Sequence, residues 1–320
     1  MGSIPDFLLK LQYPAAKVLV DFFRLIPYRI AIPLARSLGL IAWLADPFHR
    51  KVARMQMRNA LGPAYRPELV RNVFMNHGDI MVDAVRYAYM DDAEIRSRII
   101  IEGKEHLDKA LATRKGIMII TGHIGNWEIL SHLPRLLDIQ FCVMADVRKD
   151  PRLESLVDNI RVRSGATILP PKGKALMLIR ELKRGNTIGM IMDQRGKRSD
   201  KLFCDFFGMP APTNPAPAFI AIKGDAVILP VAAIKKDSRY TVRFFEPRHA
   251  ASFGDAKEGI APLAQYMQSW VESLVRLNPD QWFWLHCRWA RRSEMRRIIR
   301  KGMDFRSFVF SEADKSMKTP

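Results

Sequence analysis

A histidine and a glutamate stand five residues apart in the stretch MIITGHIGNWEIL, residues 118–130. The apolar run 116–121 predicts a strand, so His123 follows its carboxyl end, where the catalytic groups of open α/β sheets usually gather. Asn126 is a suitable N-cap, which would place Glu128 in the first turn of a helix. A nearby carboxylate can fix one imidazole nitrogen and raise the basicity of the other. The pair therefore predicts a general base for a hydroxyl nucleophile.

Two glycines flank this histidine. Gly122 and Gly125 allow a tight turn and leave the imidazole accessible. The spacing also fits a less specific interpretation, in which His123 is a solvent-facing loop residue and Glu128 is an acid favoured by the helix dipole. A metal site is disfavoured, because two ligands are too few and no third joins them.

Short apolar runs rich in Ile, Val and Met predict the strands of the larger, second part of the chain. They are residues 116–121, 141–144, 166–169, 187–192, 227–233 and 240–245. Helical patterns lie between several of them, the clearest at 174–186, which ends in basic residues and a glycine. Its preceding segment PPKGKAL lacks a full phosphate-binding loop and predicts the start of that helix. The alternation predicts an α/β domain with a mostly parallel central sheet, and residues 193–219 predict a structured loop that crosses the sheet edge.

The composition excludes a disordered or fibrous protein, and 320 residues suffice for one large or two small domains. The chain has 51 Lys and Arg against 33 Asp and Glu, a formal net charge of +18. Such a charge favours an acidic partner, which charge alone does not identify: nucleic acid, an anionic membrane, an acidic protein or a phosphorylated substrate. The three cysteines form no CxxC pair, which argues against a disulfide framework or a zinc site and is compatible with the cytosol.

The first ninety residues have helical periodicity, with apolar stretches at 7–27 and 29–48. The apolar block 30–45 is interrupted by a proline and an arginine and is shorter than the ~20 residues of a clean membrane span. An interfacial or strongly tilted membrane helix fits it better, with flanking basic residues that meet anionic headgroups. The alternative is a pair of amphipathic helices packed on the core.

The segment GHIGNWE resembles the HxxxxE/D motif of the lysophospholipid acyltransferase superfamily, specifically its lipid A biosynthesis (lauroyl/myristoyl) acyltransferase branch. Further segments are similar to that branch in the same order: VARMQMRNALGP, DQRG followed by FFGMPAP, and NPDQWFWLHCRW. The resemblance runs from about residue 20 to about residue 292. It implies a glycerol-3-phosphate acyltransferase-like α/β fold with a mixed sheet flanked by helices. The expected organisation is a membrane-associating helical segment at 1–60, a catalytic domain at 61–306 and a tail at 307–320.

The resemblance also implies a function. A fatty acyl group would pass from an acyl carrier protein or coenzyme A thioester to a hydroxyl of a lipid A precursor or related glycolipid, at the cytoplasmic face of the bacterial inner membrane. His123 would remove the hydroxyl proton, while Glu128 orients the imidazole. The expected partners are the acyl donor, a phosphorylated glycolipid and an anionic membrane surface, with no further cofactor, no metal and no nucleic acid. A phosphatidylinositol mannoside or lysophospholipid acceptor stays open, as does a non-catalytic module that binds nucleic acid or anionic lipid.

Further site residues follow from the same resemblance. Those expected to stabilise the oxyanion or bind the substrate are polar side chains near the sheet edge: Asn126, Arg161, Arg163, Asp193, Gln194 and Arg195. Arg163 is preferred over Arg161 for the oxyanion because it precedes Ser164 and Gly165. Arg195 stands where the family commonly has a second acid. An apolar wall for the acyl chain is expected from the segment Phe206, Phe207 and Gly208, for which a core role is the alternative.

Four aromatic residues, Trp282, Phe283, Trp284 and Trp289, alternate with arginines near the end of the chain. They suit base stacking or a membrane-interface belt, and the resemblance favours the belt. The basic segment 288–306 predicts a solvated or membrane-facing helix. Beyond residue 306 the sequence has no informative pattern.

Overall fold

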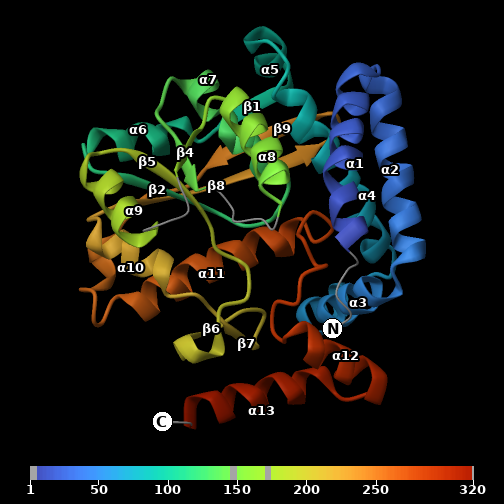
Figure 1. The fold of residues 1–320 in the computed structure, drawn as a ribbon. Helices are drawn as coiled ribbons and strands as arrows, with labels where there is room; N and C mark the ends of the chain where they lie inside the picture. The colour runs from blue at the N-terminus through green and yellow to red at the C-terminus, as the bar shows by residue number, and fades with distance from the viewer. Residues whose placement is uncertain (1–5, 145–149, 170–173, 319–320) are drawn as a thin grey trace.

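The computed structural model describes residues 6–144, 150–169 and 174–318. Its centre is a sheet with helices on both faces (Figure 1). The strands of this sheet are β1 (Ile99–Glu102), β2 (Ile117–Thr121), β3 (Cys142–Met144), β4 (Thr167–Leu169), β5 (Thr187–Ile191), β8 (Val227–Lys236), β9 (Arg239–Phe244) and β10 (Arg248–His249). They run in the order β1-β9-β8-β2-β5-β3-β4, with β10 paired to β8.

The sheet is mixed, with a parallel centre. Strand β2 pairs in parallel with β5 and β8, and β3 in parallel with β4 and β5. The hairpin β8–β9 is antiparallel. All five residues of β2 are buried, and Ile119 packs on the opposite face from Met118 and Ile120. The prediction of a mixed sheet flanked by helices, with central strands buried on both faces, is confirmed.

Ten further helical elements lie between β1 and the C-terminal helices or directly before β1 in the described residues. They are α5 (Asp92–Arg98), α6 (Lys104–Ala112), η2 (Trp127–His132), α7 (Leu133–Leu137), α8 (Pro151–Arg163), α9 (Lys174–Lys183), η3 (Arg198–Asp200), α10 (Ala216–Lys223), η4 (Ala250–Phe253) and α11 (Ile260–Leu277). Apolar side chains of α5, α6 and α7 pack on one face, and those of α9, α10 and α11 pack on the other.

The six strands expected from apolar runs are present, within two or three residues of the expected bounds. The sequence missed β1 and β10, and it missed the hairpin β6 (Phe203–Asp205) and β7 (Pro210–Pro212) inside the long loop. These strands have two to four residues each, too few for an alternating pattern to stand out. Residues 170–173, where the sequence predicts a helix start, lie outside the described residues.

The helical expectation for the N-terminal ninety residues is confirmed by α1 (Asp6–Leu25), α2 (Tyr28–Ala45), α3 (Pro47–Leu61), the short η1 (Gly62–Ala64) and α4 (Glu68–Tyr87). Figure 1 shows α1, α2 and α4 standing together beside the sheet. Helices α2 and α4 approach closely at Gly39 and Gly78, where an added Cβ would collide with the carbonyl of Phe74 or Ala35. One side of α2 is therefore fixed against α4.

The other side of α2 is an exposed apolar stripe. It consists of Ile30, Leu34, Leu38, Ile41 and Leu44. These positions recur every three or four residues and so line one side of the helix. Within the described residues, Tyr28–Ala45 is the one helix whose length and composition would suffice to cross a membrane. The packing of one side of α2 on α4 fits the alternative of helices packed on the protein, and membrane attachment through the exposed apolar side stays a prediction.

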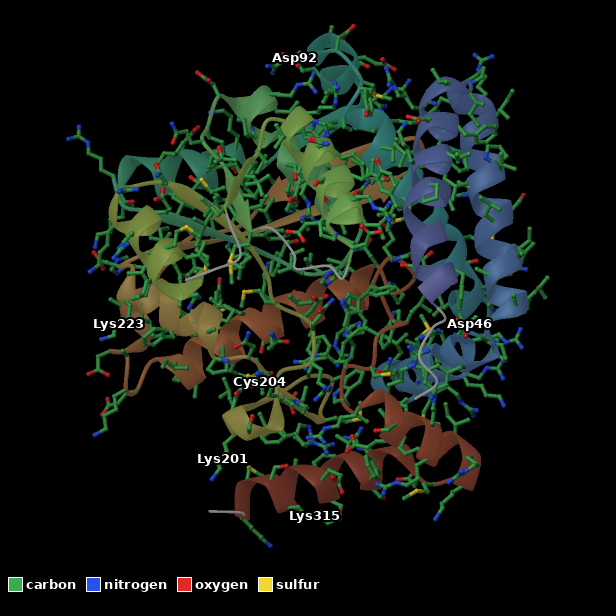
Figure 2. All side chains as sticks on the ribbon, in the orientation of Figure 1. Asp46, Asp92, Lys201, Cys204, Lys223 and Lys315 are labelled. Carbon is green, nitrogen blue, oxygen red and sulfur yellow. The ribbon has the colours of Figure 1, made fainter. Side chains whose placement is uncertain are left out.

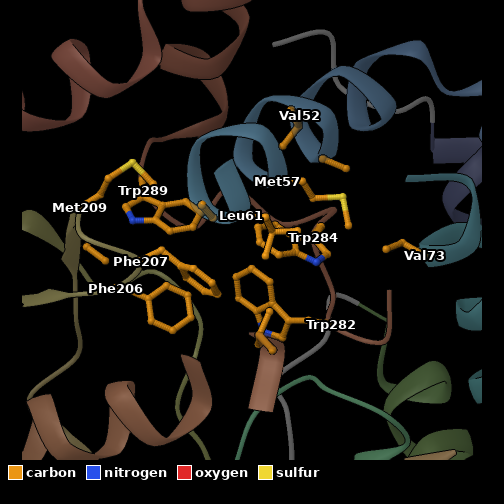
Figure 3. Close-up of a cluster of buried hydrophobic side chains, with 14 of the residues drawn as sticks. Val52, Met57, Leu61, Val73, Phe206, Phe207, Met209, Trp282, Trp284 and Trp289 are labelled. Carbon is orange, nitrogen blue, oxygen red and sulfur yellow. The ribbon is translucent and has the colours of Figure 1, made fainter. Parts of the chain in front are cut away.

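The aromatic segment near the C-terminus lies in the core. Trp282, Trp284 and Trp289 are each 1% exposed or less, and Figure 3 shows them gathered with Phe206 and Phe207 beside α3. The prediction of a membrane-interface belt is wrong for these three tryptophans, and so is base stacking, because buried rings meet neither bases nor headgroups. The local sequence pattern does not show the long-range packing that places these tryptophans in the core and not at a surface.

The C-terminal residues extend this core. The basic segment forms α12 (Arg292–Lys301), as expected, but it buries Met295 and Ile298 in the cluster around α3. Helix α13 (Phe305–Lys318) packs Phe308 there too, although the sequence beyond residue 306 has no informative pattern. Among the basic residues, Lys201, Lys223 and Lys315 are exposed at the surface (Figure 2).

Candidate active site

The loop after β2 is held on both sides. The carbonyl of His123 accepts from the backbone N–H of Phe283 at 2.9 Å, and Gly125 N–H donates to Gln281 O at 3.0 Å. On the other side Asn126 N–H donates to Ala233 O in β8 at 2.8 Å. The φ of Gly125 is +58°, and a Cβ there would overlap that same carbonyl. The glycine is thus required by a left-handed turn and a close backbone approach, as its sequence position suggested.

The imidazole of His123 is paired with a buried carboxylate. Its Nδ1 donates to Asp193 Oδ1 at 2.7 Å, and its backbone N–H donates to Asp193 Oδ2 at 2.6 Å. Asp193 follows β5, the parallel neighbour of β2, and also accepts from Trp282 Nε1 at 2.6 Å. These bonds fix the tautomer in which Nδ1 carries the proton and Nε2 is the free base.

Electrostatics single out this histidine from its neighbours. Burial lowers the pKa of His123, but the charge and hydrogen bond of Asp193 and the charge of Glu128 outweigh it, so the pKa is raised above its usual 6.5. Burial lowers the pKa of His77 and of His286 to about 4 each. Despite the burial of Asp193, its carboxyl has a pKa well below the usual range because of His123. Of these three histidines, His123 alone has a raised pKa, because it alone is hydrogen-bonded to a buried carboxylate.

Glu128 does not orient the imidazole. Asn126 caps the following turn as expected, with its side chain accepting from Glu128 N–H at 3.2 Å, but the element is the 3₁₀ turn η2. Glu128 instead accepts from Arg161 Nη2 at 2.7 Å and Nε at 2.9 Å. The sequence-based role of Glu128 at the imidazole is thus taken by Asp193, and Glu128 acts on His123 through its charge.

The structure separates the two candidate arginines. Arg161 is paired with Glu128 in η2, whereas Arg163 is exposed, with its guanidinium 4.7 Å from the centre of the Tyr89 ring. Two residues along an α-helix are turned by about 200°, so both cannot face the site. The preference for Arg163 is not supported by this arrangement.

Of the remaining residues that the sequence placed at the site, one lies beside His123 and two do not contact it. Gln194 Nε2 lies 3.4 Å from His123 Nε2, so it is at the site. Asn126 is fully buried and contacts the hydroxyl of Tyr240 at 3.4 Å, which leaves it a structural role. Arg195 is half-buried and donates to Gly196 O at 3.1 Å. It has no recorded contact with His123 within the described residues.

The expected acyl wall lies elsewhere. Phe206 and Phe207 are core residues, at most 3% exposed, and Gly208 is exposed at the tip of the β6–β7 hairpin. None of them lines a cavity next to His123 in the part of the chain that the structure describes. The alternative of a core role, which residue type allowed equally, is the one that the structure has.

An apolar cavity of about 230 Å³ lies beside the loop that follows β2. Trp127, Glu128 and Arg161 line it together with mostly apolar side chains: Ile119, Leu130, Phe141, Val143, Met190 and Ile191. Trp127 also stands edge-on to the imidazole of His123, with ring centres 4.7 Å apart. The sequence missed this cavity, because its walls come from β2, β3, β5 and η2 together. We name it the apolar cavity.

The fold is thus a mixed α/β sheet that has a carboxylate-bound imidazole just beyond the carboxyl end of β2 and an apolar cavity nearby. The family model for bacterial lipid A biosynthesis acyltransferases matches residues 9–291. The chain belongs to this family.

Individual relatives are distant. A phosphatidylinositol mannoside acyltransferase of Mycobacterium tuberculosis (strain ATCC 25618 / H37Rv) is 26% identical over 202 residues. The alignment covers 62% of this chain, and it spans only 62% of the length of the relative. The lipid A biosynthesis palmitoleoyltransferase of Escherichia coli (strain K12) is 22% identical over 277 residues, 83% of this chain and 87% of the relative. A crystal structure of the 1-acyl-sn-glycerophosphate acyltransferase PlsC from Thermotoga maritima aligns at a TM-score of 0.38 and 16% identity, over 78% of this chain and 97% of that one.

Proposed function

We propose that this protein is a membrane-associated acyltransferase that moves a fatty acyl group from an acyl carrier protein or coenzyme A thioester to a hydroxyl of a lipid A precursor or related glycolipid. The observation that carries the proposal is the His123–Asp193 pair, whose imidazole contacts Trp127, a residue that lines the apolar cavity. Family membership supports it, and so do the names of the relatives.

The chemistry requires a base and a charge at the carbonyl. Nε2 of His123 takes the proton of the acceptor hydroxyl as its oxygen attacks the thioester carbonyl. The C–O bond forms, the C–S bond breaks, and the departing thiolate receives the proton from His123. Asp193 stabilises the imidazolium that forms between these steps. Arg161, which is paired with Glu128 and lines the apolar cavity, supplies the positive charge for the oxyanion.

The apolar cavity suits the acyl chain, and Gly189 gives a test. An added Cβ at Gly189 would lie 2.5 Å from Cζ of Phe141, which lines the cavity, so Gly189→Ala pushes the ring aside. We expect selectivity to shift toward shorter acyl chains by about tenfold or more, because each methylene that no longer fits costs about 1–3 kcal/mol. Competition assays with thioesters of graded chain length measure the shift.

Gly224→Ala is the matched control for this test. It creates a similar close approach, 2.6 Å to Cδ1 of Leu182, on the side of the sheet away from the cavity. It should destabilise the protein without changing chain selectivity. An identical selectivity profile for wild type and Gly189→Ala would remove the acyl chain from the apolar cavity.

The membrane role is assigned to the stripe on α2. Its apolar side chains are exposed along the helix while the opposite side packs on α4, which favours a helix lying in the interface over one that spans the bilayer. Basic side chains at its ends, such as Arg29 and Arg50, suit anionic headgroups. The cytoplasmic face of the bacterial inner membrane is the proposed location, since activated acyl donors are made in the cytosol.

The acceptor is tested by mass spectrometry of lipids from cells with the wild-type protein, with His123→Ala, and without the protein. We expect one glycolipid to gain the mass of an ester-linked acyl chain in wild-type cells alone. A mannoside or a lysophospholipid gaining that mass would identify the alternative acceptors. Indistinguishable lipids in the three strains would contradict the proposal. The nucleic-acid-binding alternative is not retained, because three of the four aromatic rings it requires are buried.

A further inference from the structure

A second cavity, of about 380 Å³, is lined in part by Gly125 of the loop that follows β2. Lys235 at the end of β8 and Tyr240 at the start of β9 also line it. Its side chains are almost all polar, and they come from α2, α4, the β8–β9 turn and the segment before Trp282: Arg36, Asn76, Lys235, Asp237, Asp280 and Gln281. We name it the polar cavity.

The walls of the polar cavity are held in place by a buried network. Lys235 Nζ lies 2.8 Å from Asp83 and 3.3 Å from Asp79, both at most 1% exposed. Arg36 Nε donates to Asp79 at 3.0 Å. The side chain of Gln281 bonds both backbone groups of Lys235, at 3.0 and 2.9 Å. Burying such charges costs free energy that apolar packing would not. We take this cost as a sign that the wall of the polar cavity holds a ligand.

Hydrogen-bonding groups in the polar cavity stay available to a ligand. Side chains Asp237 and Asp280 form no ion pair within the described ranges. The side chain of Arg36 is 47% exposed and contacts Asp79 through Nε, and its two terminal nitrogens have no hydrogen bond within the described residues. Carboxylates, an amide and a guanidinium together match neutral hydroxyl groups, which both donate and accept. Two carboxylates oppose a phosphate, and the cations oppose a metal ion.

We propose that the polar cavity binds a sugar ring of the acceptor lipid. This inference rests on the proposed function. Gly125 borders the polar cavity and Trp127 the apolar one, and both belong to the loop that begins at His123. In this arrangement the sugar lies beside the Gly125 end of the loop that carries His123, and the acyl chain lies beside its Trp127 end.

The test uses Asp237→Asn combined with Asp280→Asn. The φ of Asp237 is +56°, a left-handed conformation that Asn tolerates, so the change removes charge with little strain. With the glycolipid acceptor we expect the acceptor KM of the double variant to rise about tenfold or more, since hydrogen bonds to charged groups are the stronger ones. The acyl-donor KM, and the KM for a lysophospholipid without a sugar, should not change.

Asp138→Asn is the matched control. Asp138 is also exposed and left-handed, with φ +54°, but it precedes β3 at the opposite end of the sheet. An unchanged glycolipid KM in the double variant, or an equal rise with the lysophospholipid, would overturn the sugar site while the proposed function stands.

Direct binding separates the two proposals. Saturation-transfer NMR of the full chain with methyl mannoside and with methyl glucosaminide needs no turnover. We expect transfer to at least one glycoside in wild type, Asp138→Asn and His123→Ala, and its loss in the double variant. Absence of transfer to both glycosides in wild type, or undiminished transfer in the double variant, contradicts the sugar site. A wild-type protein that binds the glycoside but moves no acyl group contradicts the proposed function alone.

Discussion

His123→Ala is expected to lose acyl transfer by a factor of about 10²–10⁴, the usual contribution of a general base. The loss falls on kcat, because the substitution removes the group that takes the proton and leaves both cavities intact. Stability should change little: Asp193 keeps two of its hydrogen bonds, from the backbone N–H of residue 123 and from Trp282. The measurement is the initial rate of ester formation from an acyl thioester, with thermal unfolding of the same samples.

A second histidine provides the control. His249 is paired with Asp225 at 2.9 Å beside Lys115, at the opposite end of the sheet from the site. His249→Ala removes the same atoms without touching the catalytic loop, so its rate should equal that of wild type. Ester formation by His123→Ala at the wild-type rate would exclude the catalytic role of this imidazole.

The location of the site was predictable, because it depends on local signals. The apolar runs before His123 and before Asp193 mark buried strands, and parallel strands present their carboxyl ends at one edge. Both residues were therefore expected at that edge, and the structure places them in contact. The turn at Gly125 and the cap at Asn126 were likewise predictable, since a left-handed turn and a helix cap require particular residue types.

The partner of His123 was not predictable from spacing. Glu128 is nearer in sequence, but η2 turns it toward Arg161, which comes from a helix more than thirty residues later. Asp193 reaches the imidazole because β5 pairs with β2, a long-range choice that no local pattern encodes. The same reason explains the tryptophans: their residue type fits a membrane belt, but contacts with α3 and the β6–β7 hairpin bury them.

Asp193 accounts for both of these differences from the sequence-based expectation, since it joins His123 to the buried aromatic cluster. Its carboxylate accepts three N–H groups, two from His123 and one from Trp282. An amide in its place has one oxygen and one NH₂. If the oxygen faces Nδ1 of His123, the NH₂ meets the other two donors. If the NH₂ faces Nδ1, the imidazole carries its proton on Nε2 and cannot act as the base.

Asp193→Asn is therefore expected to lower kcat by a factor on the order of 10²–10⁴, comparable to the loss of the carboxylate in other carboxylate–imidazole pairs. It should also change the pH dependence. The base is active when neutral, so the rate of wild type rises with pH through the raised pKa of His123. Without Asp193 the burial that lowers this pKa prevails over the remaining charge of Glu128, so the midpoint moves to lower pH.

The shift of the pH midpoint in Asp193→Asn distinguishes a positioning role of Asp193 from a structural one. A variant that is merely less stable loses rate by the same factor at each pH and keeps the wild-type midpoint. A variant with a displaced tautomer shows both the lower midpoint in kcat/KM and altered ¹⁵N chemical shifts of the His123 ring. A midpoint that stays in place, with unaltered ring shifts, would show that Asp193 supports the fold while another group sets the basicity of His123.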